Sequence, residues 1–233
     1  MSFIQFDNVV KVYGTEENKQ YAVNHVSFQI DEGEFVVILG QSGAGKSTVL
    51  NMLGGMDSPT SGTISVNGRT ISGMTDDELS DYRATDIGFI FQFYNLIPTM
   101  TAYENVALTR DIVPDAADPQ KMLEAVKLGN KLNKFPTQMS GGEQQRVSIA
   151  RALSKNPKFL LGDEPTGALD AETGKEVLVL MQNMCREKNI TTILVTHNAN
   201  IALCADKVIH MRDGKIKEVQ VNPAPVDARE VDF

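Results

Sequence analysis

The segment Gly40–Ser47 has the residue types and spacing of a phosphate-binding loop. It reads Gly-Gln-Ser-Gly-Ala-Gly-Lys-Ser and fits the pattern G-x-x-x-x-G-K-[ST]. Glycines let several backbone N–H groups converge on one anion, where a Cβ would block the approach. Lys46 supplies a positive charge for the β- and γ-phosphates, and the Ser47 hydroxyl is placed for Mg²⁺. We therefore predict that this loop binds a nucleotide.

Two adjacent carboxylates, Asp163 and Glu164, follow the apolar run Phe159–Gly162. Ligands bind at the carboxyl ends of buried parallel strands, so both side chains are expected beside the nucleotide. Asp163 is predicted to hold Mg²⁺, and Glu164 to act as general base on an attacking water. A helix N-cap pair is the alternative interpretation, and the phosphate loop upstream favours the catalytic one.

His197 lies just past the end of another predicted strand, at residues 191–195. A lone histidine is more often structural than catalytic. Its place beyond the carboxyl end of a sheet strand nevertheless allows it to reach the same phosphate.

The periodicity of apolar residues predicts an α/β fold with a mainly parallel sheet. Strand, glycine loop and helix are followed by further strand–helix alternation. A mainly helical block at about residues 101–155 interrupts it, and we interpret this block as an inserted lobe. Strands are expected at 3–12, 22–30, 35–39, 87–91, 158–162 and 191–195, helices at 46–53, 75–84, 171–187 and 198–204, and hairpin turns at Asn67-Gly68 and Asp213-Gly214.

Composition disfavours several other classes of protein. The 233 residues include 22 Lys and Arg against 30 Asp and Glu, a net charge of −8, which disfavours nucleic acid as the main ligand. The sequence contains no run of about 18 apolar residues, so it predicts no membrane-spanning helix. The first residues lack a signal-peptide pattern. Two cysteines, Cys185 and Cys204, are too few for a disulfide scaffold and fit a reduced setting.

A third motif, Met139-Ser140-Gly141-Gly142-Glu143-Gln144-Gln145-Arg146, lies between the two sites. With the phosphate loop and Asp163-Glu164, it makes the chain resemble the ATP-binding cassette (ABC) ATPases over about residues 3–219. The resemblance implies a RecA-like P-loop core with an N-terminal antiparallel β subdomain and an α-helical subdomain inserted at about residues 93–155. It implies one ABC ATPase domain over residues 1–220 and a C-terminal tail over 221–233, which we expect to be an extended strap or disordered.

The resemblance also implies a role for each matching residue. Glu164, His197 and Gln92 would carry hydrolysis, and Ser47, Gln92 and Asp163 would hold Mg²⁺. Tyr13 matches the aromatic residue that stacks on adenine, with a plain packing residue as the alternative. The remaining ATP-binding positions are Gly40, Ser42, Gly43, Ala44, Gly45, Lys46, Ser47, Thr48, Ser140, Gly141, Gly142 and Asp170.

The Ser140-Gly141-Gly142 signature has a physical logic of its own. A serine and two glycines at a helix N-terminus make a second anion site, although Ser140 alone could be a helix cap. One chain then carries two half-sites far apart in sequence, and two copies facing head-to-tail would sandwich two ATP molecules. The family pattern Leu-Ser-Gly-Gly-Gln has Met139 and Glu143 here, which puts a carboxylate near the bound nucleotide.

Finer features resemble the ATPases of macrolide exporters, lipoprotein-release systems, the cell-division pair and antimicrobial-peptide resistance transporters. This branch implies a homodimer on the cytoplasmic face of the membrane that drives an integral membrane permease and binds no nucleic acid. A soluble ABC ATPase acting on nucleic acid or the ribosome is the alternative, and it would predict coiled-coil arms, cysteine clusters or basic patches. An apolar segment beside Gln92 is expected to be half core and half docking surface: Phe93, Tyr94, Leu96, Ile97, Met100, Tyr103 and Val106.

Overall fold

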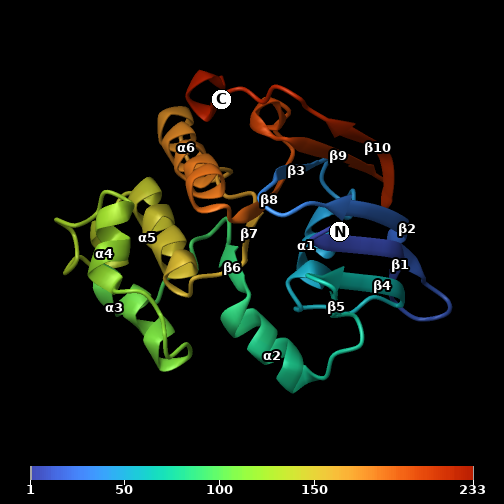
Figure 1. Cartoon of the computed structure of the whole chain (residues 1–233), viewed down its shortest axis with the longest axis horizontal. Coiled ribbons are helices and arrows are strands. Elements are labelled where there is room, and N and C mark those ends of the chain that lie inside the picture. Colours follow the sequence, from blue (N-terminus) through green and yellow to red (C-terminus); the bar gives the residue numbers. More distant parts are fainter. Residues whose placement is uncertain (1, 233) are drawn as a thin grey trace.

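The computed structural model describes residues 2–232, which form two β-sheets and six α-helices (Figure 1). The smaller sheet is antiparallel and has the strand order β2-β1-β4-β5. Its strands are β1 (Ile4–Tyr13), β2 (Gln20–Ile30), β4 (Ser61–Val66) and β5 (Arg69–Thr70). The β4–β5 turn at Asn67-Gly68 is the one expected, and both residues have positive φ.

The larger sheet has the order β10-β9-β3-β8-β7-β6 and is parallel except for β10. Its strands are β3 (Phe35–Leu39), β6 (Ile87–Ile90), β7 (Phe159–Asp163), β8 (Thr191–Thr196), β9 (Lys207–Arg212) and β10 (Lys215–Val221). Leu39 pairs with Thr196 and Asp163 with Val195, so the carboxyl ends of β3, β7 and β8 meet at one edge. The predicted α/β fold with a mainly parallel sheet is confirmed.

The helices are placed where strand–helix alternation and capping residues put them. They are α1 (Lys46–Leu53), α2 (Asp76–Thr85), α3 (Ala102–Ala107), α4 (Pro119–Ala125), α5 (Gly141–Ser154) and α6 (Ala171–Lys188). Helix α2 begins with a complete capping box between Thr75 and Glu78. Helices α3 and α4 pack on α5 away from the small sheet, at the left of Figure 1.

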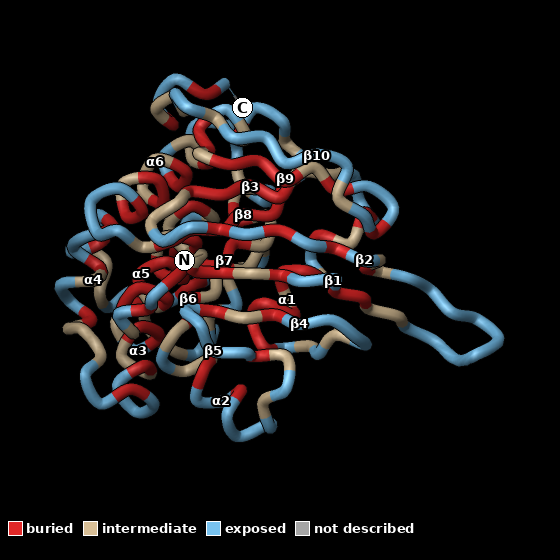
Figure 2. The backbone as a smooth tube through the Cα atoms, turned by 45° about the vertical axis from the view of Figure 1, so that its right-hand side comes forward, coloured by how far each residue is buried: buried red, intermediate tan, exposed pale blue. Residues whose placement is uncertain are grey.

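Strands β3, β7 and β8 of the larger sheet are buried on both faces, which explains why they are largely apolar. Along β3, Val36 and Ile38 face a cluster shared with α1 and the small sheet. Phe35 and Val37 face a second cluster shared with α5 and α6. Figure 2 shows this buried layer in the middle of the molecule.

The prediction of a helix at 198–204 is wrong, because only a short 3₁₀ helix (Ile201–Cys204) forms there. The Asn198 N–H donates to Thr196 Oγ1 at 3.1 Å, and the Asn200 N–H donates to Asn198 Oδ1 at 2.9 Å. These side-chain acceptors occupy the N–H groups locally, so the backbone does not enter an α-helix.

The tail packs on the domain as a strap. Ala228 and Val231 are buried, and a 3₁₀ turn (Ala228–Glu230) contacts α6. Gln182 of α6, only 2% exposed, donates to Cys204 O at 3.1 Å and Val226 O at 3.0 Å and accepts from the Ala228 N–H at 2.9 Å. One glutamine thus ties the tail to the turn that follows β8.

No helix within residues 2–232 is long and apolar enough to cross a bilayer. Cys185 and Cys204 are buried free thiols, and burial raises the pKa of Cys185 to about 11 and that of Cys204 to about 12. Both pack as small apolar residues and are poor nucleophiles at neutral pH.

Candidate active site

An open cavity of about 1360 Å³ lies at the carboxyl ends of β3, β7 and β8. Predicted site residues from five distant segments of the chain line it together: Tyr13, Gly40 to Thr48, Gln92, Asp163, Glu164 and His197. The parallel register causes this convergence, because it places the ends of neighbouring strands side by side.

The glycine loop between β3 and α1 has the backbone of an anion cradle. Gly43 and Gly45 have φ values of 79° and 94°, which side chains rarely adopt. A Cβ on Gly45 would strike the carbonyl of Ala22 in β2, whereas a Cβ on Gly43 would meet no atom within 4 Å. The small sheet therefore backs the loop, and the Gly43 side is open to a ligand.

Lys46 begins α1 and is only 7% exposed. Its Nζ donates to the carbonyl of Gln41 at 3.0 Å, which holds the ammonium group over the loop. Since the N-terminus of α1 adds its positive dipole end, loop, helix and lysine together fit a polyphosphate.

Ser47 and Asp163 form the part of the cavity that could hold a metal ion. Ser47 Oγ donates to Asp163 Oδ1 at 3.0 Å across 116 residues of chain. Burial raises the pKa of Asp163, and the nearby Glu164 raises it further, while the bonds and charges of Ser47 and Lys46 oppose the shift. Hydroxyl and carboxylate oxygens fit Mg²⁺, which prefers few protein ligands beside phosphate oxygens.

Glu164 and His197 face each other in the cavity. His197 Nδ1 lies 2.8 Å from Glu164 Oε1, and Thr196 Oγ1 donates to Glu164 Oε2 at 3.2 Å. Glu164 has a φ of 48°, a left-handed conformation that costs energy in a residue with a side chain. Its N–H donates to Val195 O at 3.0 Å, which holds this conformation and aims the carboxylate at His197.

Tyr13 ends β1 at the rim of the cavity and is 42% exposed. Its hydroxyl donates to Asp57 Oδ2 at 2.5 Å, and Lys11 Nζ lies 4.9 Å from the ring centroid while pairing with Asp57. Burial and the Asp57 carboxylate raise the pKa of Tyr13, so the hydroxyl stays a donor. The ring is held in place yet half exposed, as a stacking platform needs.

Ser140, Gly141, Gly142 and Asp170 do not line this cavity. Ser140 is exposed and caps α5, with its Oγ accepting from the Glu143 N–H at 3.3 Å. Within one chain, Ser140 therefore acts as a helix cap, which was the alternative interpretation of this residue. Asp170 caps α6 in the same manner, through the Thr173 N–H at 3.1 Å. A Cβ on Gly142 would overlap the Thr173 side chain, so α5 and α6 require a glycine there.

The β9–β10 hairpin contributes cavity residues that sequence reasoning missed: His210, Met211, Arg212, Asp213, Gly214 and Lys217. The Gly214 N–H donates to Ala44 O at 3.1 Å, and its carbonyl accepts from the Asn24 N–H at 2.8 Å. The sequence predicted the turn at Asp213-Gly214, but no local signal shows that it lies against a loop about 170 residues earlier.

A glycine loop after the buried strand β3, a carboxylate pair at the end of β7 two strands away, and a parallel sheet define a P-loop NTPase. The family model described as "ABC transporter" matches residues 23–167. The chain belongs to the ABC transporter family of ATP-binding proteins, and it is an ATPase subunit of a transporter that binds ATP with Mg²⁺.

Curated relatives agree over nearly the whole chain. An uncharacterised ABC transporter ATP-binding protein of Methanocaldococcus jannaschii is 46% identical over 221 residues, 93% of this chain and 98% of the relative. The macrolide export ATP-binding/permease protein MacB of Rhodopirellula baltica is 41% identical over 92% of this chain, which spans only 32% of that protein.

A solved structure shows the same fold at a TM-score of 0.86 and 39% identity, covering 94% of this chain and 98% of the other. It is a dimeric ATP-binding cassette of Methanocaldococcus jannaschii in a post-hydrolysis state, bound to ADP and Pi.

Proposed function

We propose that this subunit powers an exporter or mechanotransmission complex of the macrolide, antimicrobial-peptide or lipoprotein class. Two copies would close head-to-tail on ATP and drive an integral membrane permease from the cytoplasmic face of the membrane. The likeness to macrolide export ATP-binding/permease proteins, at 41% and 42% identity, supports this class.

One observation carries the dimer proposal: the Ser140–Gly142 segment lies outside the cavity of its own chain. Ser140 is exposed at the start of α5, where the backbone N–H groups of the first turn favour an anion. A second copy can therefore offer this segment to the nucleotide of the first. The dimeric state of the related cassette supports a dimer of this chain.

Within the cavity, we assign hydrolysis to Glu164 as general base on the attacking water, with His197 holding its carboxylate through the 2.8 Å contact. Ser47, Asp163 and Gln92 would hold Mg²⁺, which offsets the negative charge of the phosphates when bound. Gly40 to Thr48 orient the triphosphate, and Tyr13 supports the adenine.

The permease contact is proposed for the segment beside Gln92. Phe93 is 73% exposed and Ile97 is 38% exposed, whereas Val106 is fully buried. The segment is thus part core and part surface, and its exposed apolar side chains fit a short apolar helix of a membrane partner. The net charge of −8 disfavours the soluble alternative acting on nucleic acid or ribosomes.

The test uses Glu164→Gln, which keeps the size of the side chain and removes the base. We expect ATP to convert this variant from monomer to dimer in size-exclusion chromatography while turnover falls by at least about 100-fold. Hydrolysis at the parental rate would remove Glu164 as the base, and a monomer at saturating ATP would refute the closed dimer.

The partner is tested by purifying tagged Glu164→Gln with ATP from detergent-solubilised native membranes. Recovery of an integral membrane protein with a large extracytoplasmic domain supports the proposed class. Phe93→Ser should lose that protein but keep ATP-dependent dimerisation, because Phe93 is exposed and does not line the cavity. Recovery of soluble proteins alone would favour the alternative.

A further inference from the structure

The start of α5 carries an acidic residue where the proposed dimer needs to attract an anion. Glu143 lies at the third helical position, three residues after Ser140. A free carboxylate there would repel a phosphate of the second copy and compete for the same helix N-terminus. Contacts within the same chain bind the Glu143 carboxylate and neutralise its charge.

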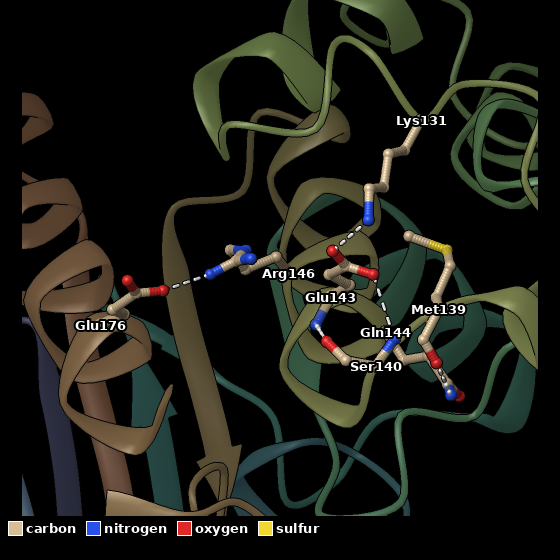
Figure 3. A network of polar contacts seen from close by, with 7 residues as sticks. All are labelled: Lys131, Met139, Ser140, Glu143, Gln144, Arg146 and Glu176. Carbon is tan, nitrogen blue, oxygen red and sulfur yellow. Dashed lines mark hydrogen bonds and ion pairs between the residues drawn. The ribbon is translucent and has the colours of Figure 1, made fainter. Parts of the chain in front are cut away.

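Both oxygens of Glu143 are engaged within the chain (Figure 3). Oε2 accepts from the Ser140 N–H at 3.0 Å and completes the capping box. Oε1 forms an ion pair with Lys131 Nζ. The Glu143 side chain is 16% exposed and the Lys131 side chain is 33% exposed, so solvent screens this ion pair less than a pair at the surface.

Lys131 is well placed for this contact, because the turn that carries it is fixed by backbone hydrogen bonds. The Lys131 N–H donates to Leu128 O at 2.9 Å. On its far side, Leu132 O accepts from the Tyr103 N–H at 2.9 Å, and Lys134 O accepts from the Ala102 N–H at 2.8 Å, both at the start of α3. Backbone hydrogen bonds therefore fix the turn to the start of α3, which packs on α5.

Arg146, one turn further along α5, makes no ion pair with Glu143, although its charge also lowers the pKa of that carboxyl. It points to the other side of the helix and pairs with Glu176 of α6 at 2.5 Å (Figure 3). The Lys131 bond is the largest influence on the Glu143 carboxyl and holds its pKa below the ordinary value, so the group is ionised at neutral pH.

We propose that Lys131 is a positioning residue for the signature segment. It neutralises Glu143 and locks it in the capping box, so that Ser140 and the N-terminus of α5 offer an uncharged donor surface to a phosphoryl group bound by the second copy. This inference rests on the proposed ATP-closed dimer and goes beyond it, since it names what makes a glutamate acceptable in the signature.

The test is a double-mutant cycle in the full chain carrying Glu164→Gln, with the ATP concentration for half-maximal dimerisation as the readout. Lys131→Met keeps the apolar stem and removes the charge, and should raise that concentration on the order of tenfold. In the Glu143→Gln background the same change should cost less than about twofold, because no carboxylate is left to neutralise. Lys131→Gln is the second variant and should behave like Lys131→Met.

Lys158→Met is the matched control, because Lys158 pairs with Asp86 at 2.9 Å and does not line the cavity. It should leave dimerisation unchanged in both backgrounds. ADP affinity of the monomer should also be unchanged by Lys131→Met, since Lys131 lies outside the cavity.

An equal defect of Lys131→Met with and without Glu143→Gln would overturn the proposal, because it would show a packing role. So would a parental value for Lys131→Met. If the parent carrying Glu164→Gln alone fails to dimerise with ATP, the proposed dimer fails with it. If that parent dimerises and the cycle shows no coupling, only the role of Lys131 is refuted.

Discussion

Gln182→Met is predicted to destabilise the domain more than any surface substitution. None of its three hydrogen-bond partners lines the cavity, so the effect is on stability. Gln182 is 2% exposed and makes three hydrogen bonds, to Cys204 O, Val226 O and the Ala228 N–H. Methionine has a similar length but bonds none of them. Each lost bond costs about 1 kcal/mol, and the orphaned Ala228 N–H, in a residue that is 0% exposed, costs up to about 3 kcal/mol.

The expected loss is therefore about 3 to 5 kcal/mol of unfolding free energy. For a chain of this size, that corresponds to a fall in Tm of about 10 °C. Urea unfolding followed by circular dichroism measures it, since the chain has no Trp for fluorescence. Gln120→Met is the matched control: its pair with Glu124 is exposed, and the change should stay within about 0.5 kcal/mol.

A truncation of residues 222–233 tests how much of the effect comes from the hydrogen bonds between Gln182 and the tail. It removes two of the three partners of Gln182, so the truncation should cost at least about 1 kcal/mol less in the Gln182→Met background than in the parent. The role of the three Gln182 hydrogen bonds, the Gln182 clamp, would be refuted by either of two results. One is a free energy of unfolding of Gln182→Met within about 0.5 kcal/mol of the parent. The other is strict additivity of the substitution and the truncation.

Three further predictions concern the cavity and the signature. Lys46→Ala should lower ATP affinity by at least about tenfold in calorimetry, because a charge-assisted contact is lost, and unchanged affinity would contradict the phosphate-loop assignment. Tyr13→Ala should weaken binding of a fluorescent ATP analogue more than Tyr13→Phe, which keeps the ring and loses only the Asp57 bond; equal effects would argue against stacking. The pKa of Glu143 is lower in the folded state than in the unfolded state, where it is near 4.5. Its contribution to stability is therefore full above the unfolded-state pKa and is lost as pH falls through the folded-state pKa. The free energies of unfolding of the parent and of Glu143→Gln should then converge under acid unfolding.

Much of the fold could be predicted from local pattern. The apolar run at 159–162 predicted β7, turn residues predicted the hairpins at Asn67 and Asp213, and the helix expected at 75–84 forms as α2 behind the Thr75 capping box. The failure at residues 198–204 has a local cause as well, because the Thr196 and Asn198 side chains bond the backbone there. Helical periodicity does not reveal that competition.

By itself, the sequence predicted the chemistry: a loop for phosphates, an acid for Mg²⁺, an acid for water and a second anion motif. Only the tertiary structure decided which of them share a cavity. Parallel register brings Asp163, Glu164 and His197 to the phosphate loop, whereas the packing of α5 on α6 keeps Ser140 outside it. The Lys131 pair with Glu143 and the Gln182 clamp were likewise invisible in the sequence, because each joins side chains through contacts that no local propensity encodes.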